Sequence, residues 1–429
     1  MLSHAENAIV TQTGPGTPLG NVMRRYWVPA LLSSELPEPD GAPVRVPLLS
    51  EKLVAFRDSD GKIGLLDEFC PHRRASLFLG RNEECGLRCV YHGWKFDAAG
   101  NCVDMMNEPP DTRYKSKIHI TAYPTAEMGG VVWAYLGPKE RMPALPKFEW
   151  TQVPTTHRHV SKIRQACNWL QALEGGIDTA HAPILHRTLN TSTQRAGMRA
   201  GSDFVTGKAP LIEMEMTDYG YCYAGVRSLG EHGNRGNHVR THHYMMPFHQ
   251  LRPKSPTFHG AAGFESVFGH MWVPLDDENC MVYNFAYSFG EHPISVAEWE
   301  AVEANLGRSP KEELPGFRSV RNISNDWLID RQVQKTETFT GIEGVNNQDL
   351  AVQESMGPIV DRTKEHLSLT DRAVVTTRRL LLQAAKTVAD GGDPPGLGES
   401  CHRVRAIEKT LHVDVAWRDA MRQELFPTP

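Results

Sequence analysis

The sequence predicts an α+β protein: a small all-β domain followed by a larger domain with an antiparallel sheet flanked by helices. Three observations predict this organisation. The 429 residues are too many for one hydrophobic core, so two domains are expected. Short segments of alternating polarity, separated by turns, extend from about residue 43 to 138. After residue 150 a helical period appears, followed by strand-like runs and then mostly helices.

The first 40 residues are expected to form a segment that packs on the body of the protein. They contain a turn-rich TGPGTPLG and then NVMRRYWVPALL, whose apolar positions favour a short helix. The small domain is expected at about 40–138, with strands such as VRVPLL, KLVAFRD and KIGLLDE. Residues 137–150 are rich in Pro and charge, as is typical of a connector. The larger domain is therefore expected at 150–429.

The larger domain is predicted to start with a helix. Apolar residues recur at four-residue steps from Trp169 to Ile177, and the helix is expected to end near Pro183. Gly175 and Gly176 lie inside it at a cost of roughly 1 kcal/mol each, which indicates a close backbone approach. Strand-like runs follow, several rich in aromatic and β-branched residues: LIEMEMTD, GYCYAGVRS, HVRTHHYMMPF, SVFGHMWVPL and CMVYNFAYSF. From about residue 295 the chain is predicted to be mostly helical.

Composition excludes several classes of protein. The formal charge of −5 and the pI of about 6.4 provide no polybasic surface, so neither nucleic acid nor a membrane is an expected partner. The N-terminus has no basic stretch followed by an apolar run, and no window reaches the ~18 apolar residues of a transmembrane helix. A cytoplasmic protein is expected. The eight cysteines are scattered, which argues against a disulfide framework.

Two Cys-His pairs lie close together in the small domain. One residue separates Cys70 from His72, two separate Cys89 from His92, and 16 residues lie between the pairs. Two thiolates and two imidazoles are the ligand set of a Rieske [2Fe–2S] centre. On spacing alone, a structural zinc site and ordinary buried side chains are the alternatives. Cys85 has no partnered His and is expected to be a free thiol.

A second group of possible ligands lies in the predicted helix. Asp178 and His181 are three residues apart and are expected on one helix face. His186 follows Pro183, where the broken helix can turn it back toward the same point. Two imidazoles and an acid indicate a mononuclear metal site. A single His here is more often a core or surface residue, but the combination with the Cys-His loops favours a metal.

The flanks of these motifs, CPHRR, CVYHGWKFDAAG and NWLQALEGGIDTAHAPILH, closely resemble the oxygenase component of Rieske non-haem iron aromatic-ring oxygenases, in the phthalate dioxygenase group. The resemblance covers nearly the whole chain. It implies a 2-His-1-carboxylate triad for Fe(II), formed by His181, His186 and Asp349. One departure is Gly175, where many relatives have Asn. Three nearby acids are alternatives to Asp349: Glu343, Glu354 and Asp361.

The cluster loops also predict a role in electron transfer. They lack the disulfide-forming cysteines and the Ser found in Rieske proteins of respiratory complexes, and fewer hydrogen bonds to sulfur imply a lower potential. This suits an electron donor to an oxygenase iron. The resemblance further implies a homotrimer or homohexamer in which one subunit's cluster faces its neighbour's iron. Asp178 is then expected to bridge His92 of one subunit to His181 of the next.

Reducing power is expected from another protein. The chain has no CxxxxCxxC ferredoxin motif and no nucleotide-binding glycine fingerprint. The expected partner is a separate NAD(P)H-dependent flavin and iron–sulfur reductase.

Two arginines are the candidates for binding substrate. Arg227 shares a strand face with Tyr223, and Arg240 shares one with His242. Paired hydrogen bonds from these arginines would suit a carboxylate. The resemblance to the phthalate dioxygenase group implies an aromatic carboxylate, a phthalate isomer or a substituted benzoate. The expected reaction is cis-dihydroxylation with O2. The alternatives are a monooxygenase such as a methoxybenzoate O-demethylase, a non-catalytic Rieske electron carrier and a zinc-stabilised binding module.

Overall fold

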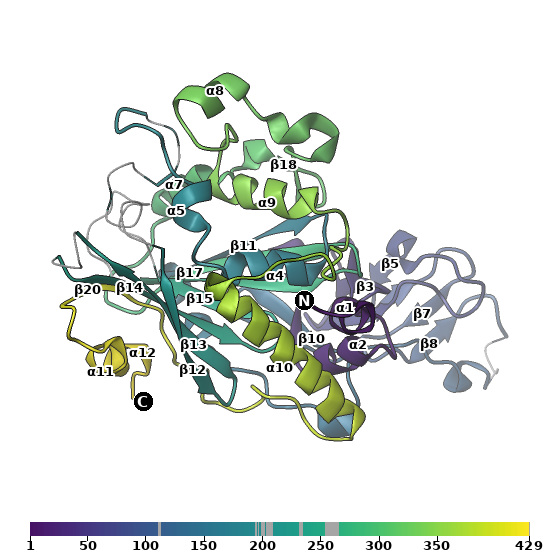
Figure 1. The fold of residues 1–429 in the computed structure, drawn as a ribbon. Helices are drawn as coiled ribbons and strands as arrows, with labels where there is room; N and C mark the ends of the chain where they lie inside the picture. The colour runs from purple at the N-terminus through teal and green to yellow at the C-terminus, as the bar shows by residue number, and fades with distance from the viewer. Residues whose placement is uncertain are drawn as a thin grey trace. The chain divides into compact units, whose positions relative to one another are not determined.

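Short antiparallel strands build the smaller of the two units into which the chain divides, Thr13–Pro146 (Figure 1). The larger unit combines Met1–Gln12 with Lys147–Pro429 and contains most of the helices. The predicted α+β class is confirmed. The computed structural model describes residues 1–109, 113–193, 195, 197–198, 202, 209–230, 235–253 and 266–428.

The smaller unit contains three antiparallel sheets, with strand orders β1-β10-β9, β2-β3-β4 and β5-β6-β7-β8. Its apolar core includes Phe56, Leu87 and Phe96, and two cysteines, Cys70 and Cys89, are part of the same cluster. The core therefore holds both thiols in place. The elements are α2 (Pro18–Met23), β1 (Trp27–Leu32), β2 (Val44–Leu48), β3 (Glu51–Arg57), β4 (Ile63–Asp67), β5 (Arg81–Glu83), β6 (Gly86–Arg88), β7 (Trp94–Phe96), β8 (Cys102–Met105), β9 (Thr125–Met128) and β10 (Val131–Tyr135).

One ten-stranded sheet forms the centre of the larger unit, in the order β12-β13-β14-β15-β16-β17-β11-β19-β18, with β20 paired to β14. It is antiparallel except for one bridge between β11 and β19. The five strand-like runs of the sequence correspond to β12, β13, β14, β16 and β17. The strands are β11 (Arg158–Gln165), β12 (Leu211–Thr217), β13 (Gly220–Ser228), β14 (Asn237–Met245), β15 (His249–Pro253), β16 (Ser266–Pro274), β17 (Cys280–Ser288), β18 (Glu313–Leu314), β19 (Arg318–Ser319) and β20 (Glu408–Leu411).

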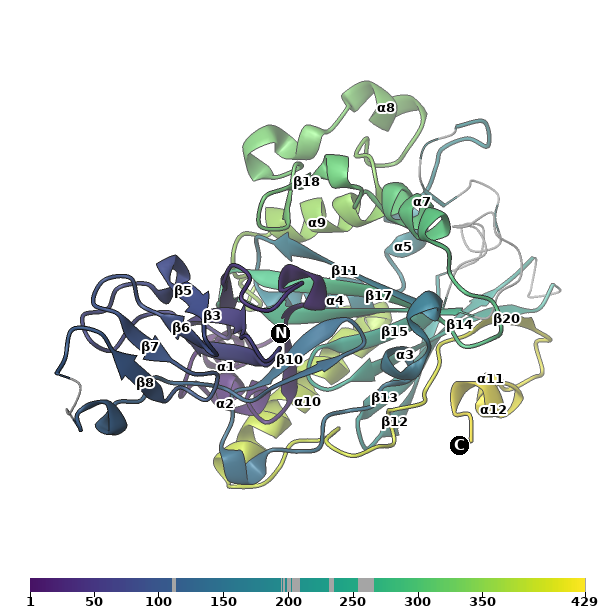
Figure 2. The same ribbon diagram turned by 180° about the vertical axis from the view of Figure 1, so that it is seen from behind.

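Helices cover both faces of this sheet. On one face α4 packs against β16, α10 packs against α4, β12 and β13, and α9 packs against α4 (Figure 1 and Figure 2). On the other face Trp417 and Leu425 pack on β13 and β14. No helix in the described ranges is long and apolar enough to cross a membrane. The helices are α1 (His4–Thr11), α3 (Glu149–Gln152), α4 (Trp169–Ile177), α5 (Ala182–Leu185), α7 (Val296–Leu306), α8 (Arg331–Thr336), α9 (Val345–Ser355), α10 (Arg372–Ala389), α11 (Trp417–Ala420) and α12 (Arg422–Leu425).

A buried ion-pair network connects α4 to α10. Glu174 on α4 pairs with Arg362 at 2.9 Å and with Arg378 of α10 at 2.6 Å. Burial alone would raise the pKa of Glu174. The two guanidinium groups have the larger effect, so the pKa of Glu174 lies below its ordinary value. The charged carboxylate therefore stabilises the fold and fixes the helix that leads into the site described below.

We expect Glu174→Gln to lower the free energy of unfolding by about 3–5 kcal/mol, because it leaves two buried guanidinium groups without their shared anion. Urea unfolding at pH 7 measures this loss. A carboxyl group whose pKa is lowered in the native state stabilises the fold at pH values above its ordinary pKa of 4.5. This stabilisation is lost as pH falls through the native pKa. The difference should therefore shrink below pH 4.5. Glu300→Gln, at an exposed position of α7, should change stability by no more than about 0.5 kcal/mol.

Candidate active site

Two similar loops position the thiols of the smaller unit. Cys70 lies just after β4 and Cys89 directly after β6, and both are buried. In each loop the cysteine carbonyl accepts a hydrogen bond of 2.9 Å from the N–H four residues later, that of Arg74 or Gly93. Both of those residues have a positive φ, 61° and 75°, which closes a tight turn. Cys85 is one of eight cysteines that form no disulfide, and all eight lie in the described ranges.

The two histidines of these loops also lie together. The rings of His72 and His92 are 4.3 Å apart between centroids, and Trp94 stacks on His72 with 7° between the planes. His72 Nδ1 is buried and has no hydrogen-bond partner among the described residues. A hydrogen bond with Cys70 lowers the pKa of Cys89 to about 6, which favours the thiolate. Two thiols and two imidazoles, one with an unpartnered nitrogen, fit the donor set of a Rieske cluster.

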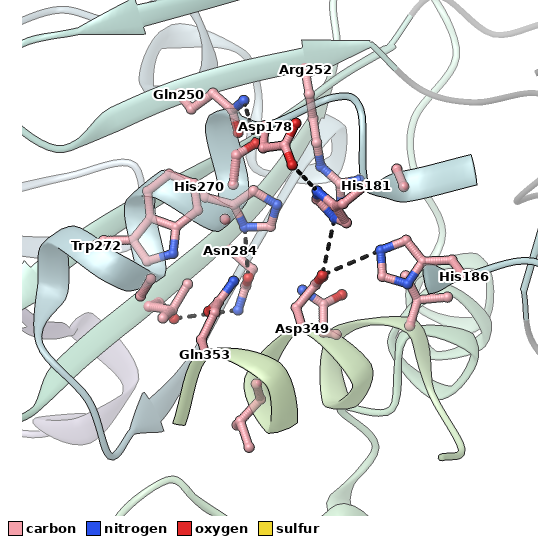
Figure 3. Close-up of a pocket in the computed structure, with 18 of the residues that line it drawn as sticks. Asp178, His181, His186, Gln250, Arg252, His270, Trp272, Asn284, Asp349 and Gln353 are labelled. Carbon is pink, nitrogen blue, oxygen red and sulfur yellow. Dashed lines mark hydrogen bonds and ion pairs between the residues drawn. The ribbon is translucent and has the colours of Figure 1, made fainter. Parts of the chain in front are cut away.

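In the larger unit, His181, His186 and Asp349 form a three-residue group whose ligand atoms all lie within 4.8 Å of one another. The Nε2 atoms of the two histidines each lie 3.3 Å from Asp349 Oδ1 (Figure 3). The histidines flank the single turn of α5, which has Pro183 near its start, and Asp349 lies on α9. Two imidazoles and one carboxylate that converge in this way fit a 2-His-1-carboxylate iron site.

The acids that were alternatives to Asp349 have other partners. Glu343 pairs with Arg195 at 2.7 Å. Glu354 accepts hydrogen bonds from the Ala166 N–H and the Trp327 indole, and Asp361 accepts from Thr363 and pairs with Lys364. Asp349 is therefore the acid of α9 that faces the histidines.

Asp178 lies at the end of α4, and the expected helix to Pro183 is wrong. The helix stops at Ile177, and Asp178 has an extended backbone with φ −72° and ψ 118°. The reason is local: Asp178 Oδ1 accepts a hydrogen bond of 2.7 Å from the Ala180 N–H, a turn that competes with the helix. Asp178 Oδ2 then lies 3.2 Å from His181 Nδ1 and holds that ring.

Gln348 holds the other histidine, and the sequence did not predict it. Its Nε2 donates to the Ile342 carbonyl at 2.9 Å, so its Oε1 faces His186 Nδ1, also at 2.9 Å, as an acceptor. His186 Nδ1 therefore donates to Gln348 Oε1, and its other ring nitrogen, Nε2, is directed toward Asp349. The only sequence signal was the position of Gln348 directly before Asp349 in NNQDL.

The charges of the triad suit a divalent cation. Burial raises the pKa of Asp349, but the imidazoles of His186 and His181 outweigh burial and hold it well below its usual range. Burial lowers the pKa of His181, and its hydrogen bonds to Asp178 and Asp349 overcome this and raise it to about 10. The carboxylate is thus anionic, and a bound cation would replace the imidazolium charge beside it.

The predicted close approach at the two glycines is confirmed. A Cβ at Gly175 would lie 2.0 Å from Gln353 Nε2, and a Cβ at Gly176 would lie 2.2 Å from the Trp272 ring. The missing side chains let α9 and β16 approach α4. Gln353 therefore occupies the space beside Gly175.

The triad opens into a cavity of about 110 Å³ between α4, α9 and the sheet. Side chains from neighbouring strands form one wall, as Figure 3 shows: Gln250, Arg252, His270, Trp272 and Asn284. Arg240 lines the cavity but pairs with Glu408 at 2.9 Å. Arg227 is fully buried and donates to the Thr179 carbonyl.

Comparison with known proteins agrees with this arrangement. Residues 26–124 match the Rieske [2Fe-2S] domain, and residues 134–425 match the family described as LigXa C-terminal domain like. The chain is 38% identical to the phthalate 4,5-dioxygenase oxygenase subunit of Pseudomonas putida, over 98% of this chain and 94% of that protein. It is 38% identical to the 3-chlorobenzoate-3,4-dioxygenase oxygenase subunit of Comamonas testosteroni, over 92% and 91%.

A third relative has a different reaction in its name. The chain is 32% identical to the 5,5'-dehydrodivanillate O-demethylase oxygenase subunit of Sphingobium sp. (strain NBRC 103272 / SYK-6), over 99% of this chain and 89% of that protein. The solved structure of the NdmA QL mutant with theobromine, from Pseudomonas putida CBB5, has a TM-score of 0.59 at 17% identity. The structural match covers 93% of this chain and 99% of the NdmA chain, which shows a shared fold.

Both parts of the chain thus match the same kind of enzyme over nearly their whole length. The chain belongs to the phthalate dioxygenase group of Rieske non-haem iron aromatic-ring oxygenases, as an oxygenase component with a [2Fe–2S] cluster and Fe(II).

Proposed function

We propose that the protein hydroxylates an aromatic carboxylate, a phthalate isomer or a substituted benzoate, by cis-dihydroxylation. The observation that carries this proposal is a cavity lined both by the triad and by arginine side chains. An anionic ring compound fits such a cavity, because the cations bind its carboxylate while the ring lies near the triad. The names of the phthalate and chlorobenzoate dioxygenase relatives support this substrate class.

The proposal assigns a separate role to each of two domains, a cluster domain at about 40–138 and a catalytic domain at about 150–429. When bound, the cluster supplies single electrons and the Fe(II) supplies O2 activation. The chain's own residues orient the ligands, since Gln348 fixes the His186 ring and Asp178 fixes the His181 ring. The cluster ligands are Cys70, His72, Cys89 and His92, and the iron ligands are His181, His186 and Asp349.

The proposal includes the partners of the protein. A separate NAD(P)H-dependent flavin and iron–sulfur reductase delivers the electrons, as expected for oxygenase subunits of this family. The protein is cytoplasmic and forms a homotrimer or homohexamer in which Asp178 connects neighbouring subunits.

Reductase-coupled turnover tests the reaction. We expect O2 consumption with at least one compound from a panel of phthalate isomers and substituted benzoates, and a cis-dihydrodiol detected by mass spectrometry. Hydrogen peroxide release without an oxygenated product from any panel member would contradict the proposed function.

O-demethylation of a methoxybenzoate is a second candidate, favoured by the similarity to the dehydrodivanillate O-demethylase subunit. The same triad and cavity would suit this demethylation reaction. Formaldehyde release from a methoxybenzoate, with no dihydrodiol from the unsubstituted acids, would replace the first candidate by the second.

A further inference from the structure

The cavity wall formed by β14 and β15 contains two polar side chains with unpartnered nitrogens. His242 is 4% exposed, and neither ring nitrogen has a hydrogen-bond partner among the described residues. Its ring stacks on Tyr223, with 4.8 Å between centroids. Arg252 Nε is also buried without a partner, and the Arg252 side chain points into the cavity toward the triad (Figure 3). Since buried polar groups are normally hydrogen-bonded, these three nitrogens of His242 and Arg252 are placed to bind a ligand.

This wall is positively charged. Burial lowers the pKa of His242 well below its usual value, and Arg240, Arg252 and Arg227 lower it further. The imidazole is therefore neutral and keeps one N–H to donate. Burial, followed by repulsion from Arg240 and Arg308, lowers the pKa of Arg252 to about 9, so the guanidinium stays protonated at neutral pH. An anion at this wall would relieve the repulsion.

Arg252 differs from the other two arginines in its partners. Glu408 pairs with Arg240 at 2.9 Å, and Arg240 also donates to the Pro253 carbonyl at 3.2 Å. Arg227 donates to the Thr179 carbonyl and does not line the cavity. Within the described part of the chain, Arg252 forms no ion pair, and its guanidinium carbon lies 5.6 Å from the centre of the Phe268 ring.

We propose that Arg252 and His242 bind the carboxylate of the aromatic substrate, an assignment that rests on the proposed function. Arg252 supplies the charge and a fork of N–H donors, and His242 supplies one more N–H. The aromatic ring then lies in the same cavity as Trp272 and Val282, beside the triad. Arg240 and Glu408 form a neutral pair next to this site, so one carboxylate is recognised.

Arg252→Met tests the assignment, because it keeps an unbranched side chain and removes the charge. Titration calorimetry of the anaerobic holoenzyme measures binding without turnover, with benzoate, phthalate and the uncharged benzamide as probes. We expect benzoate affinity to fall by about 10–100-fold, as for a lost hydrogen bond to a charged group, with benzamide affinity unchanged. Arg252→Lys should restore part of the affinity, since it restores charge without the fork. His242→Phe keeps an aromatic ring but removes the N–H donor, so benzoate affinity should fall by about 3–10-fold.

Arg318→Met is the matched control, because Arg318 is exposed and does not line the cavity. Its benzoate affinity should equal that of the wild type. Iron content and the visible cluster spectrum verify that each variant is folded and loaded. Benzoate affinity unchanged in both Arg252→Met and His242→Phe would overturn this assignment and leave the oxygenase function intact. A wild-type protein that binds neither benzoate nor phthalate would instead overturn the proposed function, and the assignment with it.

Discussion

Asp349→Ala is expected to abolish substrate oxygenation while the visible spectrum of the iron–sulfur cluster stays unchanged. Asp349 is the carboxylate that faces both imidazoles, at 3.3 Å from each Nε2. Without it two neutral imidazoles remain, which hold a divalent iron weakly. The loss of activity should exceed the roughly 10–100-fold typical of residues that only orient a ligand. Metal analysis, the visible spectrum and coupled O2 consumption measure the three consequences separately.

Glu343→Gln is the matched control for this variant. Glu343 is close to Asp349 in the sequence and lies just before α9, but it pairs with Arg195 on the surface. The control should keep the mononuclear iron and the activity. Retention of iron and turnover by Asp349→Ala, or loss of both by Glu343→Gln, would show that the triad is assigned to the wrong carboxylate.

The strands and long helices of this fold could be predicted because their signals are local. The runs that became β13, β16 and β17 are rich in aromatic and β-branched residues and are bounded by turns. β15 is only five residues long, and β20 pairs with β14 from a distant part of the chain, so neither had a clear signal. The end of α4 depended on one side chain, because Asp178 forms a turn where the helical period would continue.

The ligand residues could be proposed from short motifs, whereas the cavity wall could not. Strand alternation places Arg240 on the same face as His242, but it does not reveal that Glu408 neutralises Arg240. These two residues are 168 positions apart. Arg252 lies in a short strand without a pattern of its own, and its unpartnered Nε became visible only when the neighbouring strands were in place. Charge pairing over long sequence distances therefore decides which arginine can bind substrate.

Asp178→Asn is expected to slow electron transfer from the cluster to the mononuclear iron by about 10–100-fold, with both metal centres retained. In the chain itself, Asp178 accepts from Ala180 N–H with one oxygen and faces His181 Nδ1 with the other. An Asn at this position can still accept the hydrogen bond from the Ala180 N–H with its oxygen. Its NH2 group then faces the protonated Nδ1 of His181. The replacement thus removes the negative charge and one acceptor, while the size of the side chain is conserved.

Stopped-flow spectroscopy of the reduced protein, mixed with O2 and substrate, follows the oxidation of the cluster directly. If Asp178 only oriented His181, the variant would lose iron or substrate affinity, and the cluster in fully loaded protein would still be oxidised at the wild-type rate. A bridge between His92 of one subunit and His181 of the next predicts slow oxidation at full iron loading, because the carboxylate accepts a hydrogen bond from both rings. Asp361→Asn, which alters an acid that contacts Thr363 instead of the triad, should leave the oxidation rate unchanged.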